Sequence, residues 1–314
     1  MTRWRIVFMG TPAFAQPVLE ALLARPDPIV GVVCQPDRPR GRGLDVTSPA
    51  VARVARAHHL PVLQPTKIRD PAFVDALRAL APDLAVVAAF GRILPREILE
   101  LPTYGSINVH ASLLPRHRGA APIEWSILSG DTETGITIMA MTEELDAGDI
   151  LLARAIPLTD AHTAGTLAPS LSQLGAELIG EAIDGLRAGT IVPRAQPADG
   201  VTYAPRIERE HLRLDWTKSA AELERQVRAF APRPAAFTTL DGRALKIHRV
   251  RVVAAEAGAA PGTVVDTGPE GIILATGAGR LRIMELQLEG RRRLETGAFL
   301  AGRPLPPGTC LGGE

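Results

Sequence analysis

Cysteine is scarce in this sequence, with two in 314 residues. Cys34 and Cys310 lie far apart, so they offer neither a disulfide framework nor the spacing of a metal site. A chain without such a framework is expected in a reducing compartment. No apolar run approaches the roughly 20 residues of a membrane span, and the apolar run at 6–9 is too short for a signal peptide. We therefore expect a soluble, cytoplasmic protein without membrane contact.

Two common catalytic motifs are also missing. Gly10, which ends the first apolar run, stands without the G-x-G-x-x-G pattern of dinucleotide binding, so a nicotinamide or flavin cofactor is not indicated. No G-x-S-x-G motif appears, which favours direct transfer between two substrates over a covalent acyl-enzyme. A strong positive charge is absent as well, because the net charge is +1. The whole chain is therefore not a polybasic nucleic-acid binder.

The first half of the chain alternates apolar runs with amphipathic helices. An apolar strand at 6–9 is followed by Thr11 as a helix N-cap, a helix to about residue 25, and a second strand at 29–34. Strand, helix, strand in some thirty residues is a βαβ unit, so a parallel sheet covered by helices is expected over residues 1–189. The further predicted helices are 48–58, 71–80, 95–99, 120–128 and 164–188, and the further strands are 61–63, 84–90, 106–110, 134–141 and 150–158, the last two forming a hairpin.

The second half changes character. Residues 190–205 are rich in Pro, Gly and polar side chains and are typical of an inter-domain linker. Residues 206–314 contain one clear helix, 220–229, and several short strands, which predict a small barrel or sandwich. These strands are 236–239, 245–253, 262–266, 271–275 and 281–288.

Charge is divided unevenly between the halves. Residues 1–189 contain 17 Lys and Arg against 20 Asp and Glu, whereas residues 190–314 contain 18 against 14. Arg291, Arg292 and Arg293 form a local basic cluster in the second half. The positive excess indicates either a solvated basic face or a contact with a polyanion.

Residues 35–49 form a stretch of unusual composition. It holds three prolines, two glycines and the arginines Arg38, Arg40 and Arg42, so we expect a long loop without packed structure. Such loops are uncommon in compact domains and are usually functional or disordered. Both a solvated, mobile loop and an arm that grips phosphate remain open, because arginines serve as surface residues and as phosphate ligands.

A short strand at 106–110 places two polar groups side by side. Asn108 and His110 share one face of it, roughly 6.6 Å apart, where the strand ends. A later turn, 145–149, supplies the carboxylate of Asp146.

These three groups fit acyl transfer to an amine. An amide and an imidazolium can donate to a developing oxyanion, and a nearby carboxylate favours the imidazolium form. Two alternatives remain. His110 could be a structural strand-end histidine, or a metal site could be present, although His110, His117 and the pair His58-His59 lack a recognised ligand spacing.

The same residues carry a resemblance. Asn108 to Pro115, Arg118 to Pro122 and the turn Leu145 to Asp149 resemble the signature of the 10-formyltetrahydrofolate-dependent formyltransferases, in particular those that act on methionyl-tRNA. The resemblance runs along the whole chain and continues in residues 7–12, 35–39, 203–205, 225–230 and 261–264. It departs from the family pattern at Leu44-Asp45, at His117 and at Ala231-Pro232-Arg233-Pro234.

The resemblance implies a Rossmann-like formyltransferase domain followed by a C-terminal barrel of the oligonucleotide-binding (OB) type. It implies transfer of the formyl group of 10-formyltetrahydrofolate to the α-amine of methionyl initiator tRNA, without a metal. Asn108 and His110 would stabilise the oxyanion, and Asp146 would tune His110 and help to pass the proton. The folate pocket would be lined by Ser112, Leu113, Leu114 and Pro115, and the tRNA acceptor stem would be contacted by Arg38, Arg40 and Arg42.

Three rival functions follow from the same residues. A folate formyltransferase could act on glycinamide ribonucleotide or on a nucleotide sugar instead, and the basic second half favours tRNA over both. A folate- or nucleic-acid-binding module without catalysis is the third, and the retention of Asn108, His110 and Asp146 argues against it. We expect the protein to act as a monomer.

Overall fold

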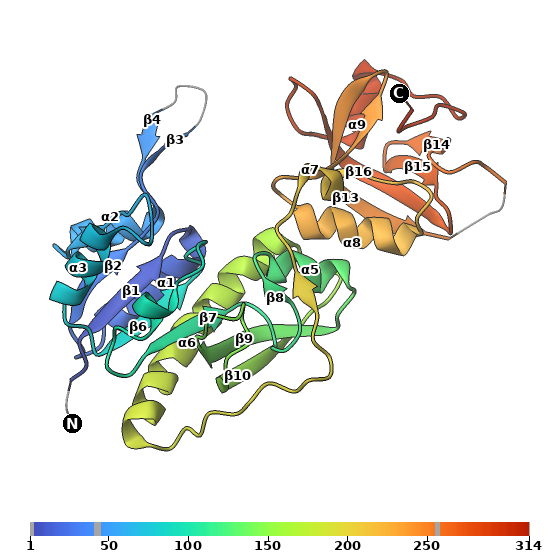
Figure 1. The fold of residues 1–314 in the computed structure, drawn as a ribbon. Helices are drawn as coiled ribbons and strands as arrows, with labels where there is room; N and C mark the ends of the chain where they lie inside the picture. Colours follow the sequence, from blue (N-terminus) through green and yellow to red (C-terminus); the bar gives the residue numbers. More distant parts are fainter. Residues whose placement is uncertain (1–2, 41–44, 255–257, 314) are drawn as a thin grey trace. The chain divides into compact units, whose positions relative to one another are not determined.

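The computed structural model describes residues 3–40, 45–254 and 258–313. It groups them into two compact units (Figure 1). The first unit consists of Met1–Pro122, Glu133–Pro157 and Ala168–Pro205, and the second of Ile123–Thr132, Leu158–Leu167 and Arg206–Glu314. Two early segments thus group with the C-terminal part of the chain.

The first unit is built on a seven-stranded sheet of order β10-β9-β7-β6-β1-β2-β5. The strands from β7 to β5 in this order are parallel, whereas β9 runs antiparallel to both of its neighbours, β7 and β10. The mostly parallel sheet predicted from the sequence is confirmed. The strands are β1 (Ile6–Gly10), β2 (Ile29–Val33), β5 (Val62–Leu63), β6 (Leu84–Ala88), β7 (Ser106–His110), β9 (Glu133–Ala140) and β10 (Ile150–Pro157).

Helices cover the sheet and bury its apolar side chains. They are η1 (Ala13–Ala15), α1 (Gln16–Leu23), α2 (Ala50–Ala57), α3 (Pro71–Ala79), α4 (Arg96–Leu99) and most of α6 (Ala164–Ala188). Helix α5 (Pro122–Leu128) and the first residues of α6, up to Leu167, group with the second unit. On one face, Val7 and Met9 of β1 belong to the same buried cluster as Phe73 and Leu77 of α3. On β7, Val109 meets α6 at Gly175, where an added Cβ would lie 2.8 Å from Val109 Cγ1. The close approach of α6 to β7 therefore requires glycine at this position.

The second unit contains an antiparallel sheet of order β12-β13-β16-β15-β14, with β17 paired to β16. Its strands are β12 (Ala236–Leu240), β13 (Arg243–Val253), β14 (Val264–Gly268), β15 (Gly271–Ala275), β16 (Arg280–Leu288) and β17 (Leu294–Glu295), and its helices are α7 (Arg209–Leu212), α8 (Ala220–Phe230) and α9 (Thr296–Gly302). A closed barrel needs its first and last strands to pair. Among the described residues the strand pairings leave β12 and β14 at opposite ends of an open sheet, so the predicted OB-like barrel is not confirmed.

The arginine-rich stretch 35–49 is more ordered than predicted. It contains a two-stranded ribbon of β3 (Arg38–Arg40) and β4 (Asp45–Thr47), in which Arg38 pairs with Thr47. A ribbon tolerates Pro39 because each of its strands has an unpaired edge. The expectation of a loop throughout was therefore wrong for these two segments, and Arg42 lies outside the described residues.

Residues 190–205 connect the two units along the chain, and several of them are hydrogen-bonded to the first unit. Arg194 exchanges two backbone hydrogen bonds with Ile150. Further on, β11 (Tyr203–Ala204) pairs in parallel with β8 (Arg118–Gly119). The stretch read as a linker is therefore attached to the first unit at two places.

None of the helices in the described ranges combines the length and the apolar character that crossing a bilayer demands.

Candidate active site

Strand β7 positions Asn108 and His110 where the chain leaves the sheet. It lies between β6 and β9, and all five of its residues are buried. Its β-branched residues Ile107 and Val109 point to the opposite face, where Val109 packs against α6. The polar pair therefore shares one face at the carboxyl end of the strand, as the sequence predicts.

The His110 imidazole faces a protein group on each side. Its Nε2 lies 3.0 Å from the carbonyl oxygen of His117. A carbonyl can only accept a hydrogen bond, so Nε2 carries a hydrogen. On the other side, Nδ1 lies 3.7 Å from Asp146 Oδ2. Two residues far apart in the sequence and predicted to act together are thus adjacent in the structure.

The turn that holds Asp146 is tightly built. Asp146 adopts a left-handed backbone conformation, with φ of +48°. Its Oδ2 accepts a hydrogen bond of 2.8 Å from the amide of Gly119. Two residues on, a Cβ on Gly148 would lie 1.9 Å from the carbonyl oxygen of Ala140, so only glycine fits there. These constraints direct the carboxylate toward His110.

The Asn108 amide is the available donor of the site. Its residue is 9% exposed, and among the described residues no hydrogen bond engages its side chain. Its amide atoms are not among the fully buried polar atoms without a partner, so solvent or a ligand can reach them. An amide in this state can donate to an oxygen of a bound substrate.

The segment Ser112 to Pro115 begins two residues after His110 in the chain. Ser112 is fully buried and its hydroxyl donates to the carbonyl of Arg116 at 2.6 Å. Thr137 of β9 fixes the segment, because its hydroxyl donates to Ser112 O and accepts from Leu114 N. Leu113 and Pro115 are half-buried and are the members that offer surface to a ligand. A role for these four residues in folate binding remains a prediction.

The neighbouring strands β1 and β6 mark a second feature of this edge. After β1 the chain adds β2 on one side of β1, and the later strand β6 pairs on the other side, so the strand order switches direction between β1 and β6. Ligands of open α/β sheets bind at such a switch point. Thr11, predicted to cap a helix, instead accepts from Gln35 N and donates to Phe90 O. Arg92 Nε donates to Gln35 Oε1 at 3.0 Å.

Sequence reasoning did not single out Thr11, Gln35, Phe90 and Arg92 as site residues. Thr11 and Gln35 were part of the family resemblance, but no local sequence pattern indicates the contacts among these four residues. Ile93 follows them and is 78% exposed, which leaves an apolar side chain beside the switch point.

Other predicted or chemically relevant groups lie apart from these three residues. Arg38 is exposed on the β3–β4 ribbon, and for Arg40 only the backbone is described. Burial, together with the charge of Asp37, raises the pKa of the Cys34 thiol to about 11, so it is a poor nucleophile. The described residues contain no group of three or more His, Cys, Asp and Glu side chains that could hold a metal ion.

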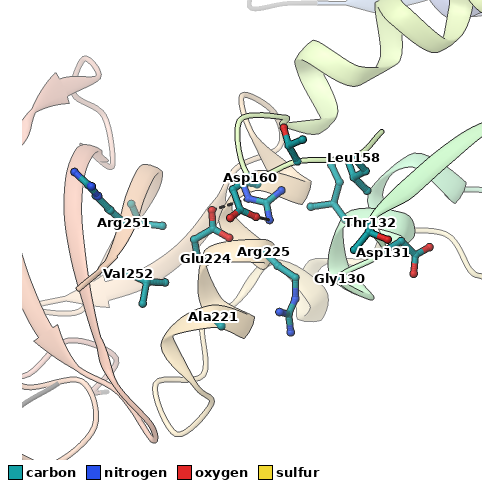
Figure 2. Close-up of a pocket in the computed structure, with 14 residues that line it drawn as sticks. Gly130, Asp131, Thr132, Leu158, Asp160, Ala221, Glu224, Arg225, Arg251 and Val252 are labelled. Atoms are coloured by element: carbon teal, nitrogen blue, oxygen red, sulfur yellow. Dashed lines mark hydrogen bonds and ion pairs between the residues drawn. The ribbon is translucent and has the colours of Figure 1, made fainter. Parts of the chain in front are cut away.

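A pocket of about 590 Å³ lies within the second unit and is lined by none of the predicted catalytic residues (Figure 2). The Arg228 guanidinium is bonded to Glu224 at 2.6 Å and to Asp160 at 3.4 Å. The whole lining holds three carboxylates, of Asp131, Asp160 and Glu224, and three guanidinium groups, of Arg225, Arg228 and Arg251, so it carries no net charge. The volume of a pocket alone therefore does not identify it as the reaction site, and the predicted catalytic residues lie in the first unit.

The chain is similar to known proteins over nearly its whole length. Residues 4–183 match the family model described as formyl transferase, and residues 206–304 match the formyl transferase C-terminal domain. The methionyl-tRNA formyltransferase of Geobacter sulfurreducens is 51% identical over 312 residues, which cover 99% of this chain and 98% of that protein. The methionyl-tRNA formyltransferase of Myxococcus xanthus is 50% identical, with 98% of each chain covered.

Solved structures resemble the fold at lower identity. HypX from Aquifex aeolicus in complex with tetrahydrofolic acid matches with a TM-score of 0.65 and 19% identity. The match covers 100% of this chain and 51% of HypX, so the chain spans about half the length of that protein. An N-formyltransferase from Helicobacter canadensis matches with a TM-score of 0.69 and 19% identity, covering 89% of this chain and 98% of that one. These likenesses concern the fold alone.

Proposed function

We propose, from the premise that this chain belongs to the methionyl-tRNA formyltransferase family, that it transfers the formyl group of 10-formyltetrahydrofolate to the α-amine of methionyl initiator tRNA. The product, N-formylmethionyl-tRNA, serves translation initiation. One observation carries the proposed chemistry. The Asn108 amide, which has no hydrogen-bond partner within the described ranges, lies on the same strand as His110, and His110 faces Asp146 at 3.7 Å. We place the reaction in the cytoplasm and assign it to a monomer.

The residues at the sheet edge fit a folate. The exposed Ile93 and the half-buried Leu113 and Pro115 offer apolar surface to its planar rings. The free Asn108 amide offers a donor to the formyl oxygen. Folate supplies the formyl group when bound, and these residues would hold and orient it.

Asn108 and His110, the two polar residues at the end of β7, have different roles in the proposed reaction. As the amine nitrogen bonds to the formyl carbon, negative charge develops on the formyl oxygen, and Asn108 donates to it. His110 Nε2–H already donates to His117 O, so it can reach the same oxygen only as a shared donor. We assign His110 mainly to proton transfer. The amine loses a proton, the bond from carbon to N10 breaks, and N10 gains a proton, with Asp146 stabilising the imidazolium in between.

Three successive parts of the chain have separate roles in this proposal. Residues 1–189 carry the folate site and the catalytic residues, residues 190–205 connect, and residues 206–314 contact tRNA. The excess of 18 basic over 14 acidic residues in 190–314 supports an RNA contact, and Arg38, Arg40 and Arg42 would add a second one. Contacts of this kind position an RNA through its backbone.

A direct assay tests the function. The protein is incubated with 10-formyltetrahydrofolate and methionyl initiator tRNA, with glycinamide ribonucleotide or an amino-sugar nucleotide as competing acceptor. We expect formylmethionyl-tRNA as the main product. Formylation of either competitor in preference to the tRNA would contradict the proposal, and so would an absence of transfer to all three.

A further inference from the structure

The stretch that joins the units makes its firmest side-chain contacts with the turn that holds Asp146. Within residues 192–200, Gln196 is half-buried whereas its neighbours are exposed. Its Nε2 donates two hydrogen bonds of 2.8 Å, one to the carbonyl of Asp146 and one to the carbonyl of Gly148. A single side chain thus spans the turn.

The other end of the Gln196 amide is fixed as well. Its Oε1 accepts from Arg118 Nε at 3.1 Å and from a terminal nitrogen of Arg118 at 2.8 Å. A primary amide has two N–H donors and one oxygen with two lone pairs, so Gln196 uses its full capacity here. Arg118 precedes Gly119, whose amide donates to Asp146 Oδ2. Gln196 therefore holds the backbone of Asp146, and Gly119, which follows the Gln196 partner Arg118, holds its carboxylate.

The same stretch also reaches the other side of His110. Thr202 Oγ1 accepts from the amide of His117 at 2.8 Å, and His117 O accepts from His110 Nε2. Both groups that face the imidazole are thus attached to residues 196–202. A left-handed non-glycine residue is strained and persists only where its surroundings fix it. The two hydrogen bonds that Gln196 donates hold Asp146 in its left-handed conformation.

We propose that Gln196 is a positioning residue for formyl transfer, which holds the Asp146 turn so that the carboxylate faces His110. The inference rests on the proposed function. Gln196 itself touches neither the imidazole nor the carboxylate, so it acts through Asp146. A displacement of about 1 Å at a catalytic group can cost roughly a hundredfold in rate.

Gln196→Glu tests the proposal sharply. The carboxylate keeps the acceptor for Arg118 and loses both donors to the turn, in a side chain of the same shape. Gln173→Glu is the matched control, because Gln173 is exposed on α6 and the charge change is the same. We expect kcat of Gln196→Glu to fall by about tenfold or more with KM for methionyl-tRNA unchanged, and Gln173→Glu to match the parent.

The pH profile separates positioning from loss of folded protein. In Gln196→Glu and Gln196→Ala, the pH dependence of kcat should shift in the same direction as in Asp146→Asn. A smaller folded fraction would lower the rate equally at every pH.

Full kcat in Gln196→Glu would overturn the inference while leaving the proposed function intact, and so would a reduced kcat with an unshifted profile. A parent protein that transfers no formyl group would overturn both.

Discussion

His110 is held between a carbonyl oxygen on one side and a carboxylate on the other. The His117 carbonyl lies 3.0 Å from Nε2, and Asp146 Oδ2 lies 3.7 Å from Nδ1. The Asn108 side chain, in contrast, has no hydrogen-bond partner among the residues that the structure describes. In the proposed mechanism, Asn108 is the donor to the oxyanion and His110 is the proton carrier.

Asp146→Asn removes the charge from this pair and keeps the shape of the side chain. The amide oxygen can still accept from Gly119, so the turn should persist. We expect kcat to fall by about a hundredfold or more, the usual contribution of a positioned proton carrier, with little change in thermal stability. His110→Ala should give a loss of at least the same size. Single-turnover formylation rates and circular dichroism measure both effects.

Asp75→Asn is a suitable control, because Asp75 is a surface carboxylate of α3 paired with Arg78. Parent-like rates in either His110→Ala or Asp146→Asn would contradict the assigned roles.

Individual site residues differed in how far the sequence could predict them. Asn108 and His110 share a strand face by simple alternation, and Asp146 lies in a turn with a recognisable motif. Gln196 and Thr202 lie in a stretch without periodicity, and their contacts reach back about 50 and 85 residues along the chain. Contacts of this kind arise from the folded path of the backbone, so no local pattern reports them.

At the scale of elements, a buried carboxylate ties the entry of β2 to the end of α6. The Asp27 side chain is fully buried, and it accepts from the amide of Trp4 and from the guanidinium of Arg187. Burial by itself would raise the pKa of Asp27, but these bonds outweigh it and hold the pKa below its ordinary value. Arg187 also lies 5.0 Å from the centre of the Trp4 ring.

Arg187→Ala should leave this buried carboxylate with two weaker partners, the amide of Trp4 and the guanidinium of Arg25, which lies 3.5 Å away. We expect the free energy of unfolding to fall by about 2 kcal/mol at pH 7, typical of losing a hydrogen bond to a charged group. Since the folded-state pKa is lowered, the unfolded chain binds the proton more readily, and the pair's contribution is lost as pH falls below about 4. The difference between parent and variant should therefore shrink in acid.

Urea titrations at several pH values measure this difference. Arg78→Ala, which breaks an exposed pair on α3, should change stability little at any pH. A loss in Arg187→Ala that stays constant into acid would show that packing, not charge, stabilises this contact.

Elements with a strong hydrophobic period were predictable, and those without one were not. The apolar runs of β1, β2, β6 and β7 and the long stripe of α6 were all predicted near their observed bounds. The two-residue strands β8 and β11 form because each is the other's partner. The β3–β4 ribbon pairs through backbone groups in a stretch whose prolines indicated a loop.

For the proposed binding of tRNA by the whole molecule, the positive excess in residues 190–314 matters more than the net charge of the chain. A contact with tRNA phosphates releases counterions, so kcat/KM for methionyl-tRNA should fall more than tenfold between about 50 and 200 mM salt. Replacing Arg291 and Arg292 with Gln should reduce the slope of log kcat/KM against log salt by about 2. Arg78→Gln, on α3, should leave the slope unchanged. A salt-independent rate in the parent would exclude an RNA contact made through phosphates.

The attachment of residues 194–204 to the first unit sets where natural or engineered recombination can join two relatives. A chimera with its breakpoint at residue 190 would take Gln196 from one parent and Arg118 from the other. The Gln196 amide uses both of its hydrogens and both lone pairs of its oxygen in these contacts, so it has no capacity to bond a different partner. A breakpoint after Pro205 keeps all of these partners from a single ancestor. The exchangeable module therefore begins at Arg206, where the second unit resumes, and not where the composition of the chain changes.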